Sequence, residues 1–217
     1  DRRQRQMCIR DRYGTLYLLH YMLSKNQEDA TAWYFFFNEF NMSEFTKEDF
    51  VSALQNYVSI NGESVAIRSM SDDFACILNT YLPRYKTSPT RVNPENNIDC
   101  PLGELGLVDI LDKSKKTYRK SISMPETLHP WVLMAVMCDQ AEGRTEIGLN
   151  ELLTAKSNIG KTFNLDAITM LDALHRVEKM GLVKIIRTAG LDVIRLEQCY
   201  SFTECVDKYY ECISKID

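Results

Sequence analysis

The feature that most constrains the fold is the apolar stretch from residue 14 to residue 40. Four aromatic side chains in it follow the i, i+3, i+4, i+7 spacing that places them on one face of an α-helix: Trp33, Phe36, Phe37 and Phe40. Three leucines line one face of the segment before: Leu16, Leu19 and Leu23. A polar break at residues 24–29 separates the two segments. We therefore predict a helical hairpin whose aromatic face is core, because such stripes form core more often than base-stacking platforms.

The remainder of the chain predicts two similar units, each made of helices followed by a β-hairpin. Residues 105–111, LGLVDIL, resemble residues 180–186, MGLVKII, and in both a helix ends at a glycine before a hairpin pattern begins. Helix, helix, helix, hairpin is the element order of a winged helix. The predicted fold class is mainly α (α+β): the helical hairpin plus two winged-helix-like units with small β-hairpins, about residues 43–122 and 128–197.

Local signals place the helix starts and ends. Thr46, with acidic residues after it, marks one helix start. Ser71 marks the next, which puts Asp73 in the first turn of that helix. Asp166 marks the start of a later helix that ends at Gly181.

The composition describes a globular protein without a membrane segment. Of 217 residues, 45% are apolar and 26% charged. No run approaches the roughly 20 apolar residues of a membrane helix, and no signal peptide is recognised. Seven scattered cysteines without a CxxC pair suit a reducing compartment, where we expect buried apolar side chains rather than metal ligands. We therefore expect a cytoplasmic protein.

Residues 1–12 differ from the rest of the chain. They hold five arginines and two aspartates without an apolar period, and we interpret them as non-native, adapter-derived sequence. Without them the formal net charge changes from −4 to −7, so DNA binding needs a local basic patch. The expected domains are residues 13–122, with the helical hairpin and the first unit, and residues 123–217, with the second unit and a C-terminal helix.

Several longer motifs resemble one bacterial family. They are GTLYLLHY and ATAWYFFFNEF in the apolar stretch, SDDFACILNTYLP in a later helix, then IDCPLGELGL and NIGKTFNLD. From Gly14 to Leu196 their order resembles the family of domain of unknown function DUF 4007. That family is similar to SspB, a component of phosphorothioate-linked anti-phage systems associated with DNA nicking. Its members usually carry a further N-terminal DNA-binding-like segment, so the resemblance implies an N-terminally truncated member.

The resemblance implies a DNA-associated component of bacterial anti-phage defence linked to phosphorothioate modification. One hypothesis is a strand-nicking factor that uses Mg²⁺ or Mn²⁺. The alternative is a non-catalytic adaptor that docks a sulfurtransferase-like or ATPase partner to DNA. A transcriptional regulator is less favoured, because the helix at residues 166–180 is not basic. The sequence leaves a homodimer open.

Two sets of basic residues are the candidates for contact with DNA. The first hairpin carries Lys113, Lys115, Lys116, Arg119 and Lys120. The second hairpin carries Lys184, Arg187 and Arg195. Basic side chains at hairpin tips can pair with phosphates, but charge runs on turns are equally common as solvated surface.

Nicking with a divalent ion requires two or three carboxylates that converge on the metal. Within the motifs of the resemblance the candidates are Asp73, Asp99 and Glu104. For Asp73, a role beside its helix N-terminus is the more favoured interpretation. The NIGK motif at residues 158–161 only partly matches a phosphate-binding loop. A lone histidine inside an apolar helix, His20, is expected to be hydrogen-bonded core.

Overall fold

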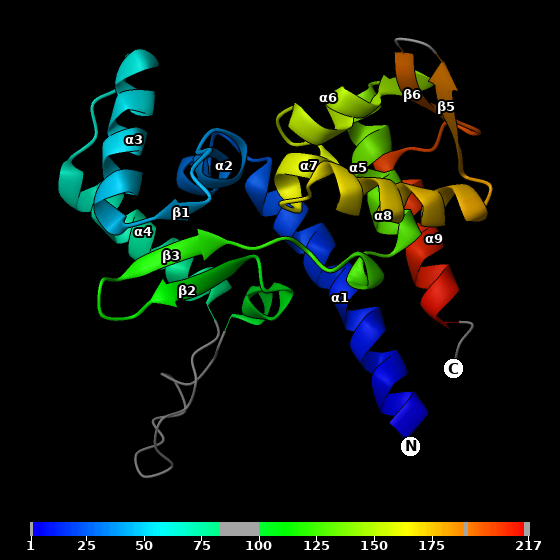
Figure 1. Cartoon of the computed structure of the whole chain (residues 1–217), viewed down its shortest axis with the longest axis horizontal. Helices are drawn as coiled ribbons and strands as arrows, with labels where there is room; N and C mark the ends of the chain where they lie inside the picture. The colour runs from blue at the N-terminus through cyan, green and yellow to red at the C-terminus, as the bar shows by residue number, and fades with distance from the viewer. Residues whose placement is uncertain (1, 83–99, 189–190, 215–217) are drawn as a thin grey trace. The chain divides into compact units, whose positions relative to one another are not determined.

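A computed structural model describes the backbone of residues 2–82, 100–188 and 191–214 (Figure 1). The chain forms two compact units, Asp1–Lys25 with Ile122–Asp217, and Asn26–Ser121. The fold is mainly helical with two small three-stranded antiparallel sheets, which confirms the predicted class. Within the described ranges, no helix has both the length and the apolar character needed to cross a bilayer.

The unit Asn26–Ser121 contains helices on one small sheet. Its elements are α2 (Thr31–Asn38), β1 (Glu44–Phe45), α3 (Lys47–Ile60), α4 (Ile67–Tyr81), η2 (Pro101–Leu105), β2 (Val108–Asp112) and β3 (Thr117–Lys120). The sheet order is β1-β3-β2, and Phe45 of β1 lies opposite Tyr118 of β3. The single strand β1 therefore pairs with the second strand of the hairpin.

The core of this unit is aromatic, as the spacing in α2 predicts. Phe36 and Phe40 are buried, and the ring of Phe36 lies 5.4 Å from Phe45 and 6.0 Å from Phe50 between centroids. Phe74 of α4 closes the cluster, 5.2 Å from Phe50. These edge-on and tilted contacts are the arrangement that aromatic quadrupoles favour. The aromatic stripe is therefore core.

Two helix starts test the capping signals. Thr46 caps α3 in a reciprocal capping box with Asp49, as predicted. The prediction that Ser71 caps the next helix is wrong, because α4 begins at Ile67. Met70, directly before Ser71, is fully buried and continues the buried face of α4 one turn before Phe74. Burial of Met70 in that extra turn outweighs a polar capping signal, and Asp73 is therefore not in the first turn.

The other unit places α5 at its centre. Its elements are α1 (Arg2–Ser24), η3 (Pro125–Thr127), α5 (Pro130–Ala141), β4 (Glu146–Gly148), α6 (Leu149–Thr154), α7 (Ile159–Thr162), α8 (Ala167–Lys179), β5 (Val183–Thr188), β6 (Leu191–Leu196) and α9 (Phe202–Ser214). The sheet order is β4-β6-β5. Helix α5 is buried around almost its whole circumference and contacts α1, α7, α8 and α9.

The first helix buries only part of the face that leucine spacing predicts, since Leu16 is buried but Leu19 is not. Leu19 is 53% exposed, whereas Tyr17, His20 and Tyr21 are buried. Their polar atoms find partners within the unit: the Tyr17 hydroxyl lies 2.9 Å from Oγ1 of Thr127, and Tyr21 donates to Asp139. An apolar-only criterion misses such a face, since tyrosine and histidine are buried when their polar tips are hydrogen-bonded.

The division into two units separates the two helices of the predicted helical hairpin. Helix α1 packs with residues after Ile122, whereas α2 belongs to the unit Asn26–Ser121. The two helices of the expected hairpin are therefore parts of different units. The later division falls after Ser121, beside the expected boundary at residues 122/123.

The two units share an element order. Each has a helix, a single strand, two further α-helices and a β-hairpin, with the short 3-10 helix η2 added in the first and the short α7 added in the second. The echoed glycines lie at the same place in both: Gly106 and Gly181 each adopt a left-handed conformation, with φ of 63° and 70°, just before the hairpin. Both predicted hairpins are present, each preceded by helices and joined by one extra strand. The winged-helix assignment of the two units stays a prediction.

Candidate nucleic-acid interface

The turn between β2 and β3 presents three lysines on a rigid base. Oδ1 of Asp112 accepts hydrogen bonds from the backbone N–H and hydroxyl of Ser114, at 2.8 and 2.7 Å, and from the backbone N–H of Lys115, at 3.2 Å. These bonds, the Ser114 hydroxyl first, hold the pKa of Asp112 below its usual range. Lys113, Lys115 and Lys116 are all exposed. We call this turn, residues 112–116, the lysine tip.

Lys120 does not belong to the lysine tip. Its Nζ donates to the backbone carbonyls of Phe36 and Phe40, each at 2.5 Å, and lies 4.7 Å from the centre of the Phe36 ring. A cation beside the last carbonyls of α2 satisfies acceptors that the helix leaves open. Lys120 therefore connects β3 to α2 within the core of its unit, and we leave it out of the interface.

Arg119 is on the opposite face of β3 and has an acidic neighbour. It lies directly across from Asp109 of β2, and its Nη2 is 3.4 Å from Oδ2 of that residue. The hydroxyl of Ser121 donates to the same carboxylate at 2.7 Å. Arg119 is exposed but partly neutralised, so it contributes less positive potential than the tip lysines.

The basic residues of the second hairpin do not converge. Lys184 of β5 pairs in register with Arg195 of β6, and Nε and Nη2 of Arg195 donate to Glu146 at 2.9 and 2.8 Å. Arg187 lies opposite Asp192 and, by strand alternation, on the other face of the sheet from Lys184. Two of the three predicted residues therefore have a carboxylate as neighbour, and the set spans both faces.

The helix before this hairpin, α8, uses its polar side chains for structure. Asp166 accepts from the backbone N–H of Thr169 at its start, at 2.7 Å. Arg176 donates to the carbonyls of Pro125 and Leu128, and Glu178 accepts from the backbone N–H of Ile185. These bonds hold α8 against η3 and β5. They agree with the sequence-based view that this helix is not a basic recognition helix.

The structure describes two of the three carboxylates that were predicted as metal ligands. Asp73 is half-buried on α4, where its partial burial and then the neighbouring Asp72 raise the pKa of its carboxyl. Glu104 is exposed on η2, which packs against α4. Asp99 lies outside the described residues. Among residues 13–82, 100–187 and 192–214, no group of three or more His, Cys, Asp or Glu side chains is arranged to hold a metal ion.

The NIGK motif forms a short helix, α7, rather than an open loop. The side chain of Asn158 accepts from the backbone N–H of Ile159 at 2.9 Å. Gly160 is buried against the backbone of Leu153, so a Cβ there would lie 2.2 Å from the carbonyl oxygen of Leu153. His20 is fully buried with Nε2 2.7 Å from the carbonyl oxygen of Thr162. The motif therefore packs α6, α7 and α1 together, and His20 is hydrogen-bonded core as predicted.

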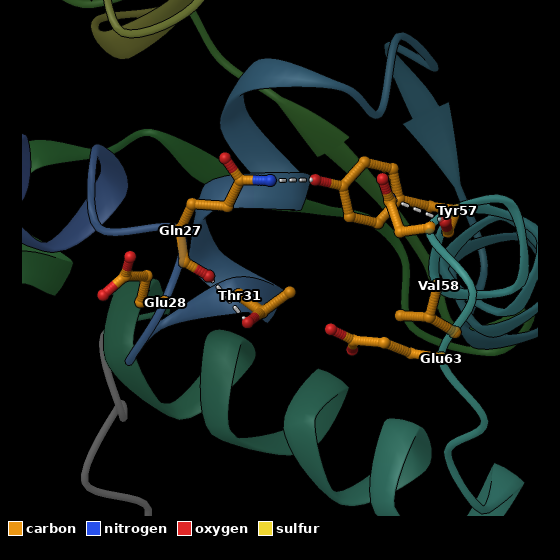
Figure 2. A pocket seen from close by; sticks show the side chains of 7 residues that line it. Gln27, Glu28, Thr31, Tyr57, Val58 and Glu63 are labelled. Carbon is orange, nitrogen blue, oxygen red and sulfur yellow. Dashed lines mark hydrogen bonds between the residues drawn. The ribbon is translucent and has the colours of Figure 1, made fainter.

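A hollow of about 420 Å³ lies between the start of α2 and the end of α3 (Figure 2). Its lining residues are Gln27, Glu28, Thr31, Tyr57, Val58, Asn61 and Glu63. Gln27 donates to the Tyr57 hydroxyl at 2.9 Å, and Thr31 donates to the carbonyl of Gln27 at 2.8 Å. With two glutamates and no basic residue in this lining, the hollow does not suit a phosphate. Sequence spacing gave no signal for it, because its residues come from two separate segments.

The chain resembles known proteins in its sequence and in its fold. A family model described as "Protein of unknown function (DUF4007)" matches residues 10–210. A structure described as "SspB crystal structure" is similar with a TM-score of 0.76 and 21% identity, covering 93% of this chain and 61% of that chain. A "Magnesium ion-bound SspB crystal structure" is similar with a TM-score of 0.74 and 20% identity, covering 92% and 61%.

The two structures and the family model cover different shares of the sequences compared. The chain spans about three-fifths of the length of those two structures, with 61% of each covered. At 20–21% identity the likeness concerns the fold. No curated protein matches this chain. The family model, in contrast, covers nearly the whole sequence. The chain therefore belongs to the DUF4007 family of proteins of unknown function.

Proposed function

We propose that the protein is a DNA-associated component of bacterial anti-phage defence linked to phosphorothioate modification, and that it contacts DNA through the lysine tip. Family membership and the fold shared with SspB support the defence context. The observation that carries the DNA contact is the set of three exposed lysines held by Asp112 at a hairpin turn. The element order of a winged helix, in which such a turn lies beside DNA, supports it further.

The chemistry of the lysine tip favours phosphate contact over base readout. Lysine is a compact point charge, whereas bidentate recognition of a guanine edge is the strength of arginine. The chain as a whole is acidic, with a formal net charge of −4. DNA is therefore repelled from most of the surface and attracted where lysines gather. We expect binding that depends on salt and little on sequence.

The test measures binding of a labelled DNA duplex by fluorescence anisotropy across a salt series. Replacing Lys113, Lys115 and Lys116 together by Gln should weaken binding at least tenfold and lower the slope of log K against log salt by about 2.7. A matched control replaces Lys47, Arg68 and Lys179, which are exposed elsewhere, by Gln. Equal loss in both triple variants would show non-specific attraction and reject the lysine tip as the contact.

The second hairpin is the alternative DNA-contact site, and the same assay tests it. A variant with Lys184→Gln, Arg187→Gln and Arg195→Gln should retain most of the affinity, because Arg195 is paired with Glu146 and the three side chains do not share a face. If this variant loses binding and the lysine-tip variant does not, the interface belongs to the other unit.

A strand-nicking activity is the second candidate function. Asp73 favours it, since it is a half-buried carboxylate with a raised pKa on α4, and α4 packs against η2, which carries Glu104. The magnesium-bound SspB structure is a further reason to test Mg²⁺ and Mn²⁺. Such an ion would activate water and stabilise the leaving oxygen.

The two functions are separated by a plasmid-nicking assay with Mg²⁺ or Mn²⁺ and an EDTA control. Nicking that is lost in Asp73→Asn or Glu104→Gln, but kept in the matched neighbour Asp72→Asn, makes the protein an enzyme. A folded protein that binds DNA without nicking is an adaptor. In that case we expect it to dock a sulfurtransferase-like or ATPase partner to DNA, and pull-down with the proteins of the defence system identifies which.

A further inference from the structure

Helices α5 and α9 lie side by side and run antiparallel (Figure 1). At one end His129, just before α5, contacts Tyr209 of α9 with ring centroids 5.1 Å apart. At the other end Lys25 connects the helices: its Nζ is 2.8 Å from Asp139 of α5 and 5.3 Å from the ring centre of Phe202 of α9. The last turn of α5 is therefore level with the first turn of α9.

Each helix places a cysteine at this level. Cys138 precedes Asp139, and Cys205 follows Phe202 by one helical turn. Cys205 and Tyr209 form the buried face of α9, and Tyr209 contacts His129 just before α5, so Cys205 faces α5. Cys138 and Cys205 are near enough to influence each other's pKa. Both cysteines are free thiols in the structure.

The two sulfurs differ in environment. Cys205 is fully buried, while Cys138 is half-buried and so retains contact with solvent. The neighbouring Cys205 thiol lowers the pKa of the Cys138 thiol, whereas the neighbouring Cys138 and burial raise the pKa of Cys205. Cys138 is therefore the accessible nucleophile and Cys205 the neighbour that resolves its oxidised form.

We propose that Cys138 and Cys205 form an oxidation site, in which a hydroperoxide converts the paired thiols into a disulfide that ties α9 to α5. The Cys138 thiolate attacks a peroxide oxygen, the O–O bond breaks, and the released hydroxide takes a proton to become water. The resulting sulfenic acid is attacked by the Cys205 sulfur. Its S–O bond breaks, and the hydroxide leaves as water with the Cys205 proton. In sum, two thiols and hydrogen peroxide give one disulfide and two waters.

The position of the proposed disulfide determines how much it stabilises the protein. The loop that it closes contains the whole β4-β6-β5 sheet together with α6, α7 and α8. A crosslink across such a long segment restricts the unfolded chain strongly. In a reducing compartment disulfides are usually transient or redox-sensing, which suits a pair that is reduced at rest.

The test oxidises the full chain, first fully reduced, with a graded excess of hydrogen peroxide and maps its peptides by mass spectrometry. We expect a linked pair of peptides that contains Cys138 and Cys205, lighter by two hydrogens and separated again by dithiothreitol. Its formation should raise the Tm by on the order of 10 °C. Cys199→Ser, an exposed cysteine of the same unit, is the matched control and should form the link normally.

Two outcomes would overturn the proposal. One is a folded wild-type protein in which peroxide oxidises Cys76 and Cys199, both exposed, without linking Cys138 to Cys205. The other is a linked form whose Tm equals that of the reduced form. Cys138→Ser should abolish both the link and the Tm shift, and the wild-type peptide map decides the question even if Cys205→Ser fails to fold.

Discussion

At the scale of single residues, Lys120 shows that two neighbouring basic side chains of a strand can point to opposite faces. It is two residues from Tyr118, so both point to the same face of β3. Tyr118 contacts Phe45 and Phe74, and Lys120 reaches the carbonyls of Phe36 and Phe40 on that face. The signal was present in the sequence, since an aromatic residue at i−2 marks the buried face. Counting charges alone overlooked it.

Replacing Lys120 by Met should therefore reduce stability without removing a DNA contact. The change deletes two charge-assisted hydrogen bonds and the cation–π contact, and should lower the free energy of unfolding by about 2 kcal/mol. Urea unfolding followed by circular dichroism measures this. The control is Lys113→Met on the exposed tip, which should leave stability unchanged. A loss of DNA affinity in folded Lys120→Met as large as in the lysine-tip variant would contradict the assignment.

At the scale of elements, the NIGK motif shows a glycine required by helix packing rather than by phosphate. Helices α6 and α7 approach so closely that Gly160 faces the backbone of Leu153. Gly148, at the start of α6, has nothing nearer to its Cβ position than 3.9 Å. Gly148 lies just before α6 and Gly160 within α7, and the space beside the two residues differs.

Gly160→Ala should therefore be strongly destabilising, because the added methyl group meets backbone that cannot rotate away. We expect a loss of about 3 kcal/mol in the free energy of unfolding, measured by urea titration. Gly148→Ala should be neutral or slightly stabilising, since alanine restricts the unfolded chain more than glycine does. Similar small losses in both variants would show that α7 moves freely relative to α6.

At the scale of the whole molecule, all three histidines belong to one unit. Burial lowers the pKa of His20 to about 4. Burial, and then the charge of Arg176, lower that of His129 to about 4. Both side chains are neutral in the folded state, whereas in the unfolded chain they take up protons near pH 6.5. Between pH 6.5 and 4 the unfolded state thus binds more protons, so stability falls as the pH falls.

This acid sensitivity should be confined to the unit that contains α1 and residues after Ile122. The fully buried His20 should cost up to about 1.4 kcal/mol per pH unit in that window, and the half-buried His129 should cost less because solvent screens it. Hydrogen exchange at pH 7 and pH 5, corrected for intrinsic rates, should show lost protection there and not in Asn26–Ser121. His20→Gln should reduce the pH dependence, and His175→Gln, which is exposed, should not. Equal acid loss in both units would refute this account.

Local signals in the sequence determined much of this protein. The aromatic stripe of α2, the Thr46 and Asp166 caps and the glycines before both hairpins are each short-range features, and the structure has each where it was predicted. The lysine tip could also be found, because Asp112 and the turn lysines are neighbours in sequence. Such features depend on backbone geometry and on side chains within about one helical turn.

Only the tertiary structure decided the features that depend on distant partners. The buried face of α1, the start of α4 at Ile67 and the role of Lys120 each follow from contacts across the unit rather than from neighbouring residues. The pairing of Cys138 with Cys205 likewise requires α9 to lie against α5. A side chain's own sequence context fixes its local conformation. Whether its polar atoms can be satisfied in the interior is fixed by residues far along the chain, because burial is favourable only when those partners are in place.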